Sequence, residues 1–187
     1  MNTEKEISQI LEQGAVKSEL DYERAIIAER KLRLLVKNDE TLKPVRKKLR
    51  DLISDWENSR WSAQANITEN MIRESDLAEL LAEKERIFIE KRKKLILSKL
   101  KSQGLSQKEL GIILGHNNKS YMSEIINGIK PLSMRNVIVI HRLLKIELND
   151  LIPGFLSQSE RIRIKSTLSK VGSTKIKLSM ADFELVD

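Results

Sequence analysis

Apolar residues recur at helical spacing in the middle of the chain, within residues 105–115. They fall on one side of a predicted helix: Leu110, Ile113 and Leu114. Ser106 and Glu109 precede them in the pattern of a capping box, in which each side chain bonds the other residue's backbone N–H. We therefore expect the helix to begin at Gln107 and to end at Gly115, since glycine accepts the left-handed backbone of a helix end.

A second short helix is predicted after the polar turn formed by residues 116–119. It begins near Ser120 and ends at Asn127 and Gly128. Its apolar residues share one face and should be core: Met122, Ile125 and Ile126. Two short helices joined by a tight polar turn predict a helix-turn-helix.

Two longer amphipathic helices are predicted upstream. Ser18 is expected to cap one that runs to about Lys37, and Thr41 to cap one with Pro44 in its first turn. The second helix has apolar residues at steps of three and four: Leu42, Val45, Leu49, Leu52, Ile53 and Trp56. With only a short polar break between them, the two helices predict a helical hairpin.

The segment between this hairpin and the helix-turn-helix begins with polar residues 61–75, which we interpret as a linker. From Asp76 to Ser102 a helical pattern returns. The side chains expected to face inward are Leu77, Leu80, Leu81, Ile87, Phe88, Ile96, Leu97 and Leu100. The basic run 91–94 leaves two alternatives open, one long helix or two helices that meet near Glu90.

Downstream, a further helix and a short closing helix are predicted before Pro153. The inward positions of the former are Met134, Val137, Ile140, His141 and Leu144. Ile138 and Val139 face outward in this pattern, which predicts that a dimer or interdomain contact covers them. In the tail, Ser157 opens another helix and residues 175–178 alternate like a short strand. This tail could fold against the domain, pair with a partner or be disordered.

The pattern as a whole predicts an all-α protein. An N-terminal helical hairpin is joined by a long helix to a five-helix helix-turn-helix domain, and a small C-terminal tail follows. The expected segments are an N-terminal extension at 1–17, the hairpin at 18–60, a linker and connecting helix at 61–85, the helix-turn-helix domain at 86–154 and the tail at 155–187.

The net charge of +7 is unevenly distributed. Residues 1–60 have 13 basic and 12 acidic side chains, residues 61–83 have 1 and 5, residues 84–154 have 14 and 6, and residues 155–187 have 6 and 4. The basic surplus therefore coincides with the predicted helix-turn-helix, as expected of a module that binds duplex DNA. A solvated lysine surface without a ligand is the alternative.

The helix-turn-helix segment resembles the phage repressor, Cro and Xre-type regulator family. The residues that carry the resemblance are Leu105-Ser106-Gln107, Glu109-Leu110-Gly111, Leu114-Gly115, Ser123, Ile125 or Ile126, and Asn127-Gly128. Gly111 departs from the family, which prefers alanine there, and the turn is one or two residues longer than usual. The resemblance implies a lambda-repressor-like domain that binds DNA.

The same resemblance implies roles for individual residues. Gln107 and Asn127 would lie against phosphates, with Lys130 and Arg135 adding charge. Four side chains would face base edges in the major groove: Lys119, Ser120, Tyr121 and Glu124. For Glu124 the alternative is a cap or a salt bridge.

The hairpin ahead of this module resembles the N-terminal region of the larger HigA-type antitoxins, on the residues Tyr22, Ala25, Asn38-Asp39 and Trp56-Glu57. This implies a cytoplasmic, homodimeric repressor of its own operon that neutralises a ribonuclease toxin. Two alternatives stay open. One is a free-standing phage-type repressor without a toxin, and the other is an adaptor that uses the same helical module to bind proteins.

Other chemistry is not indicated. Cysteine is absent, which excludes disulfides and thiolate metal sites and is compatible with a reducing cytosol. His116 and His141 are not joined by any ligand pattern, and no nucleophile elbow or phosphate-binding loop occurs. No run of eighteen apolar residues is present. We therefore expect no enzymatic activity, no cofactor or metal, and no membrane partner.

Overall fold

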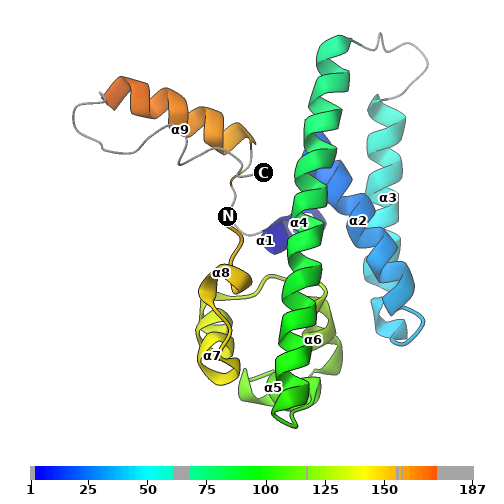
Figure 1. The fold of residues 1–187 in the computed structure, drawn as a ribbon. Helices are drawn as coiled ribbons and strands as arrows, with labels where there is room; N and C mark the ends of the chain where they lie inside the picture. Colours follow the sequence, from blue (N-terminus) through cyan, green and yellow to red (C-terminus); the bar gives the residue numbers. More distant parts are fainter. Residues whose placement is uncertain (1–2, 61–67, 117, 155, 157, 172–187) are drawn as a thin grey trace. The chain divides into compact units, whose positions relative to one another are not determined.

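The computed structural model describes residues 3–60, 68–116, 118–154, 156 and 158–171. All regular structure in these ranges is helical, which confirms the all-α prediction (Figure 1). The elements in chain order are α1 (Thr3–Gln13), α2 (Glu19–Leu35), η1 (Glu40–Leu42), α3 (Lys43–Arg60), α4 (Glu69–Ser102), α5 (Gln107–Ile113), α6 (Lys119–Ile126), α7 (Met134–Leu144), α8 (Leu148–Leu151) and α9 (Gln158–Val171). Among the described residues no helix is both long and apolar enough to cross a membrane.

Local capping explains where most of these helices begin. Ser18 accepts the backbone N–H of Asp21 in front of α2, as predicted. Thr68 caps α4 in the same way, and Ser133 caps α7. The expected Thr41 cap is wrong, because the Asp39 side chain accepts the N–H of Thr41 and caps η1 instead. A carboxylate two residues upstream therefore starts this segment earlier than the pattern indicated.

The segment from Glu69 to Ser102 is one continuous helix of 34 residues, which settles the choice between one helix and two. At 1.5 Å per residue it is about 51 Å long. It also takes in residues 69–75, so the predicted linker extends too far at its C-terminal end. Residues 61–67 of that linker lie outside the described residues.

The buried stripe of α4 differs from the predicted one. Leu77, Leu80 and Ile87 were expected to face inward but are 44%, 50% and 54% exposed. The residues that are buried follow a shifted stripe: Ala78, Leu81, Ala82, Glu85, Ile89, Arg92, Ile96 and Leu100. Two of these are charged and two are alanines, so the stripe has a weak apolar signal in the sequence.

Residues of the unit that ends at Ile152 pack around two clusters of buried side chains. The first cluster joins the C-terminal half of α4 to α5, α6, α7 and α8. The second joins α1, α2, η1 and α3, and it includes Ile129, which follows α6. The segment after α6 therefore packs on the α2–α3 pair, and α2 contacts both α3 and α4 (Figure 1).

Helix α7 presents a partly different face from the one expected. Val137, Ile140 and Leu144 are buried as predicted, but Met134 is 66% exposed. Met134 is the first residue of the helix, and Asn136 takes the buried place in that turn. His141 is half-buried, with its Nδ1 at 2.6 Å from the Ile146 carbonyl oxygen.

The two outward-facing residues expected on α7 differ from each other. Ile138 is 44% exposed, as predicted. Val139 is partly buried against the first cluster instead.

Helix α9 belongs to a second unit. Its Ile164 and Leu168 are half-buried, while Val171 is exposed. The predicted cap at Ser157 and the predicted strand at 175–178 lie outside the described residues.

Candidate nucleic-acid interface

The N-terminus of α5 has the capping box that the sequence predicts. Ser106 Oγ accepts the N–H of Glu109 at 3.2 Å, and the Glu109 carboxylate accepts the N–H of Ser106 at 2.8 Å. The backbone and hydroxyl hydrogen bonds from Ser106 lower the pKa of Glu109. Two otherwise free donors at this helix end are thereby satisfied. Gln107, the expected phosphate contact, is exposed at the first position of α5.

Helices α5 and α6 approach each other closely at Gly111. A Cβ atom at this position would lie 2.7 Å from Cγ of Met122 and 3.0 Å from the carbonyl oxygen of His116. The His116 N–H also donates to the Gly111 carbonyl at 2.8 Å, so the turn folds back tightly onto α5. Glycine, which lacks a Cβ atom, therefore fits this close crossing.

The apolar face of α6 is core, as predicted. Met122, Ile125 and Ile126 are each 2% exposed. On α5, Leu110 and Leu114 are buried, but Ile113 is 45% exposed and was wrongly expected to face inward. The α5–α6 pair thus packs through the apolar face of each helix. The other side of α5 is exposed, whereas the described side chains of α6 are all buried or half-buried.

Three of the expected DNA-facing residues form a packed cluster on α6 and the segment after it. The Glu124 carboxylate lies 2.5 Å from Lys130 Nζ and is buried, at 6% exposure. Lys130 Nζ also lies 5.0 Å from the ring centre of Tyr121, and the Tyr121 ring is 4.1 Å from that of His116. Glu124 therefore has the salt bridge given as its alternative and not an open path to a base edge.

Lys130 is only partly covered by these contacts. Its side chain is 41% exposed despite the contacts with Glu124 and Tyr121. The contacts with Glu124 and Tyr121 hold the ammonium group in one position while part of the side chain stays in solvent. Tyr121 is half-buried and lies beside it on α6.

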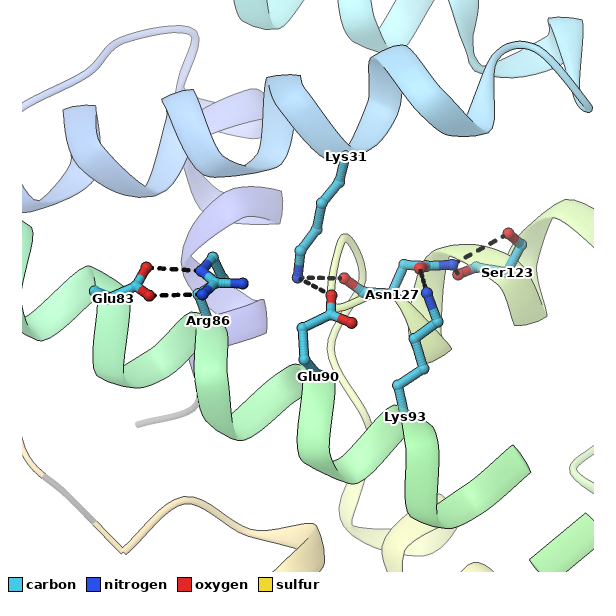
Figure 2. A network of polar contacts seen from close by, with 7 residues as sticks. All are labelled: Lys31, Glu83, Arg86, Glu90, Lys93, Ser123 and Asn127. Atoms are coloured by element: carbon cyan, nitrogen blue, oxygen red, sulfur yellow. Dashed lines mark hydrogen bonds and ion pairs between the residues drawn. The ribbon is translucent and has the colours of Figure 1, made fainter. Parts of the chain in front are cut away.

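Asn127 is buried at a junction of three helices. Its exposure is 8%, and its side-chain amide donates to the Ser123 carbonyl at 2.8 Å. Lys93 Nζ of α4 donates to its Oδ1 at 2.8 Å, and Lys31 Nζ of α2 donates to its main-chain oxygen at 3.3 Å (Figure 2). Burial and these hydrogen bonds disfavour the expected phosphate contact of Asn127, which stays a prediction.

Lys31 and Lys93 were not foreseen at this site. Lys31 Nζ also lies 3.4 Å from the Glu90 carboxylate (Figure 2). Burial lowers the pKa of Lys31, and the nearby Glu90 charge opposes that effect. Lys93 precedes Asn127 by 34 positions and Lys31 precedes it by 96, so no local sequence pattern indicates these contacts.

The remaining expected residues are placed as follows. Arg135 is exposed in the first turn of α7 and, like Gln107, makes no hydrogen bond or ion pair with the described residues. Lys119 and Ser120 begin α6, and their side chains lie outside the described part of the chain. No group of three His, Cys, Asp or Glu residues able to hold a metal occurs among the described residues.

Exposed cations lie on α5 and on the helices that share its core cluster. Lys94 and Lys101 lie on α4, Lys108 on α5, and Arg135 and Arg142 on α7. None of them is ion-paired with a described carboxylate, so their positive charge is not neutralised within the described residues. In comparison with known proteins, no family model, no curated protein and no solved structure matches this chain.

Proposed function

We propose that this protein binds duplex DNA in a sequence-dependent manner, with α5 and α6 as a helix-turn-helix. In this proposal the C-terminal half of α4 and helices α5 to α8 are a lambda-repressor-like five-helix module, and α2 and α3 are the helical hairpin ahead of it. The observation that carries the proposal is the α5–α6 pair itself. It has a capped first helix, a close crossing at Gly111 and a second helix whose apolar face packs in the core.

The burial pattern refines the roles of individual residues. Gln107, Arg135 and the exposed part of Lys130 would contact phosphates. Base edges would be read from the start of α6, by Lys119, Ser120 and Tyr121. Glu124 and Asn127 would support the interface from within by holding Lys130 and the end of α6.

The proposal is tested by selecting duplexes from a random library with the full-length chain. We expect an enriched motif whose binding weakens steeply with salt. Tyr121→Ala should then change the preferred bases, whereas Gln107→Ala should weaken all sequences to a similar extent. Failure to enrich any motif, together with salt-insensitive binding to protein partners, would instead support the adaptor alternative.

A more specific candidate is a HigA-type antitoxin, which represses its own operon as a homodimer and neutralises a ribonuclease toxin. It is supported by contacts among the residues that carry the resemblance. The rings of Tyr22 and Trp56 stack with centres 6.4 Å apart, and the Tyr22 hydroxyl donates to Glu57 at 2.7 Å. Asp39 caps the break between the two helices. The quoted pattern thus describes a real packing arrangement in this chain.

The antitoxin proposal is tested by expressing the protein with the product of the gene next to its own. We expect the two proteins to co-purify and the growth arrest caused by the neighbour to be relieved. Trp56→Ala should weaken that complex if the α2–α3 pair binds the toxin, while Arg135→Ala should leave it unchanged. A neighbouring gene without a toxic product would favour a free-standing repressor.

A further inference from the structure

The tip of the α2–α3 pair carries a concentrated positive charge. We define this tip as residues 30–50, which include the C-terminal turns of α2, η1 and the first turns of α3. It contains nine basic and two acidic side chains, a net charge of +7. Residues 1–29 and 51–83 are both net acidic. The positive charge of the tip is therefore not apparent from the net charge of residues 1–60.

Most of the tip's positive charge is not neutralised by the protein. Three cations have carboxylate partners: Lys31 with Glu90, Lys43 with Glu40 and Arg46 with Glu29. The six others are exposed and make no hydrogen bond or ion pair within the described residues: Arg30, Arg33, Lys37, Lys47, Lys48 and Arg50. The two acidic residues of the tip are already engaged, one with Thr41 and the other with Lys43.

The cations without carboxylate partners are closely spaced along the chain. Arg30 and Arg33 lie three residues apart on α2, Lys37 follows in the turn after α2, and Lys47 and Arg50 lie three residues apart on α3. Helical residues at this interval share one face. Three residues advance about 4.5 Å along a helix, and duplex DNA presents one phosphate charge per about 1.7 Å of its axis, so each pair can meet neighbouring phosphates.

Contacts along α4 place the tip next to the helix-turn-helix. Ser75 Oγ donates to Glu19 at the start of α2, Arg24 binds Glu85, and Lys31 lies beside Glu90. Residues later in α2 contact residues later in α4, so the two helices run in the same direction. The C-terminal end of α2 therefore lies toward the half of α4 that carries α5 to α8.

The same end of α2 is joined directly to the segment after α6. Lys31 donates to the carbonyl of Asn127, and Ile129 belongs to the cluster that contains Leu32 and Leu42. Arg33 lies only about 3 Å farther along the helix axis than Lys31, although side chains two residues apart leave a helix on nearly opposite sides. The free cations of the tip thus lie at the level where α6 ends, on the side of α2 that faces solvent.

We propose that the α2–α3 tip is a second DNA-contacting surface, which binds phosphates that flank the bases read by α6. This rests on the proposed function of α5 and α6. The tip supplies charge and no base-edge reader, so it adds length and salt dependence to the contact without changing the preferred sequence. An acidic protein partner could use the same charges, but the fixed position beside α6 favours the duplex that α6 itself binds.

The test compares two matched double variants of the full chain. Arg33→Gln with Lys37→Gln removes one arginine and one lysine from the tip. Arg73→Gln with Lys17→Gln removes the same residue types from exposed positions near the starts of α4 and α2, where they also lack ionic partners among the described residues. Both variants should keep the wild-type thermal midpoint, since neither alters a packed contact.

Binding is measured as a function of salt on two duplexes, the selected site alone and the same site with one extra helical turn of DNA at each end. On the extended duplex the tip variant should lower the log–log salt slope by about two relative to wild type, and the control variant should not. On the short duplex all three proteins should share one slope. The charge-preserving variant Arg33→Lys with Lys37→Arg should restore the wild-type slope.

Each alternative result has a definite meaning. Equal slopes for the tip and control variants on the extended duplex overturn this inference alone and leave the tip to another polyanion, such as an acidic protein surface. A lowered slope on the short duplex as well places the tip on the site itself and overturns the flanking assignment. If the wild-type chain binds no selected duplex, the proposed function and this inference fall together.

Discussion

Arg24 of α2 and Glu85 of α4 form a buried, two-pronged ion pair. Arg24 Nε donates to Oε2 at 2.8 Å and Nη2 donates to Oε1 at 2.5 Å, with both side chains less than 10% exposed. Two parallel hydrogen bonds fix both the position and the orientation of the partners. This pair therefore sets the register of α2 along α4, and with it the position of the α2–α3 tip beside α6.

Breaking this pair from one side should be more harmful than removing it completely. Glu85→Met leaves the Arg24 guanidinium buried without its main carboxylate, and we expect the free energy of unfolding to fall by about 3 to 5 kcal/mol. The double variant Arg24→Met with Glu85→Met should recover most of that loss. Chemical denaturation measures both. A double variant at least as unstable as the single one would show that the pair is strongly favourable in itself.

The same pair shows where sequence reasoning stops. Capping patterns act over three residues, so the caps at Ser18 and Ser106 could be predicted correctly. The buried stripe of α4 contains Glu85 because Arg24, 61 positions away, makes its burial tolerable. A period search that counts only apolar residues assigns such a position to the surface. It therefore identified Leu81, Ile96 and Leu100 correctly but wrongly included Leu77, Leu80 and Ile87.

Prediction of the candidate site from the sequence was limited in the same way. The two helices, their core residues and the capping box follow from local pattern and are observed. The Glu124–Lys130 pair spans six residues across a helix end, a separation that no surface rule for helices includes. The resemblance implies that Asn127 contacts a phosphate. In the structure its side-chain and main-chain oxygens accept hydrogen bonds from Lys93 and Lys31, which are distant in the sequence.

Gly111→Ala should destabilise the protein even though alanine is the better helix former. Alanine gains about 1 kcal/mol in helix propensity, but its Cβ would lie too close to Met122 and to the backbone oxygen of His116. Overpacking of this kind costs about 1 to 3 kcal/mol, so we expect a lower thermal midpoint. Gly154→Ala, where a Cβ meets nothing within 4 Å, is the control. A raised midpoint for Gly111→Ala would contradict the close crossing.

Glu109 gives the capping box a pH dependence. The hydrogen bonds from Ser106 lower its pKa in the folded state, so the charged form is favoured by folding. The stabilisation is therefore complete above the ordinary glutamate pKa and is lost as the pH falls through the lowered folded value. Carbon-detected NMR titration should show a depressed Glu109 pKa that rises part of the way to its ordinary range in Ser106→Ala, because alanine keeps the backbone N–H donor and loses only the hydroxyl. An unchanged pKa in that variant would exclude the Ser106 hydroxyl as a cause.

Asn127 and Lys130 should behave differently in DNA binding. Asn127→Ala leaves Lys93 without its acceptor and should reduce the free energy of unfolding by about 1 to 3 kcal/mol, while the salt slope for DNA stays unchanged. Lys130 is tested in a Glu124→Gln background, so that no buried carboxylate is left unpaired. There Lys130→Gln should lower the salt slope by about one unit for specific and nonspecific DNA alike. A slope that changes for Asn127→Ala would restore its assignment as a phosphate contact.

Met134 and Ile138 are the basis for the proposed homodimer. They lie four residues apart on one face of α7 and are 66% and 44% exposed, whereas Val139 already packs against its own core. Complete burial of two such side chains contributes roughly 3 to 6 kcal/mol before the cost of association. A second copy of the chain, related by a twofold axis, is the simplest partner to cover this face. Such a dimer would also present two copies of α6 to two half-sites of one operator.

Substitution of both α7 residues tests this interface. Met134→Lys with Ile138→Lys should give a folded monomer in sedimentation velocity, since the added charges would meet across the twofold axis. Ile72→Lys with Leu80→Lys places the same charges on exposed apolar positions of α4, at 52% and 50% exposure, and should leave the dimer intact. If the α7 variant stays dimeric while the α4 variant dissociates, the twofold interface lies on α4. The two copies of α6 would then require a different spacing of half-sites.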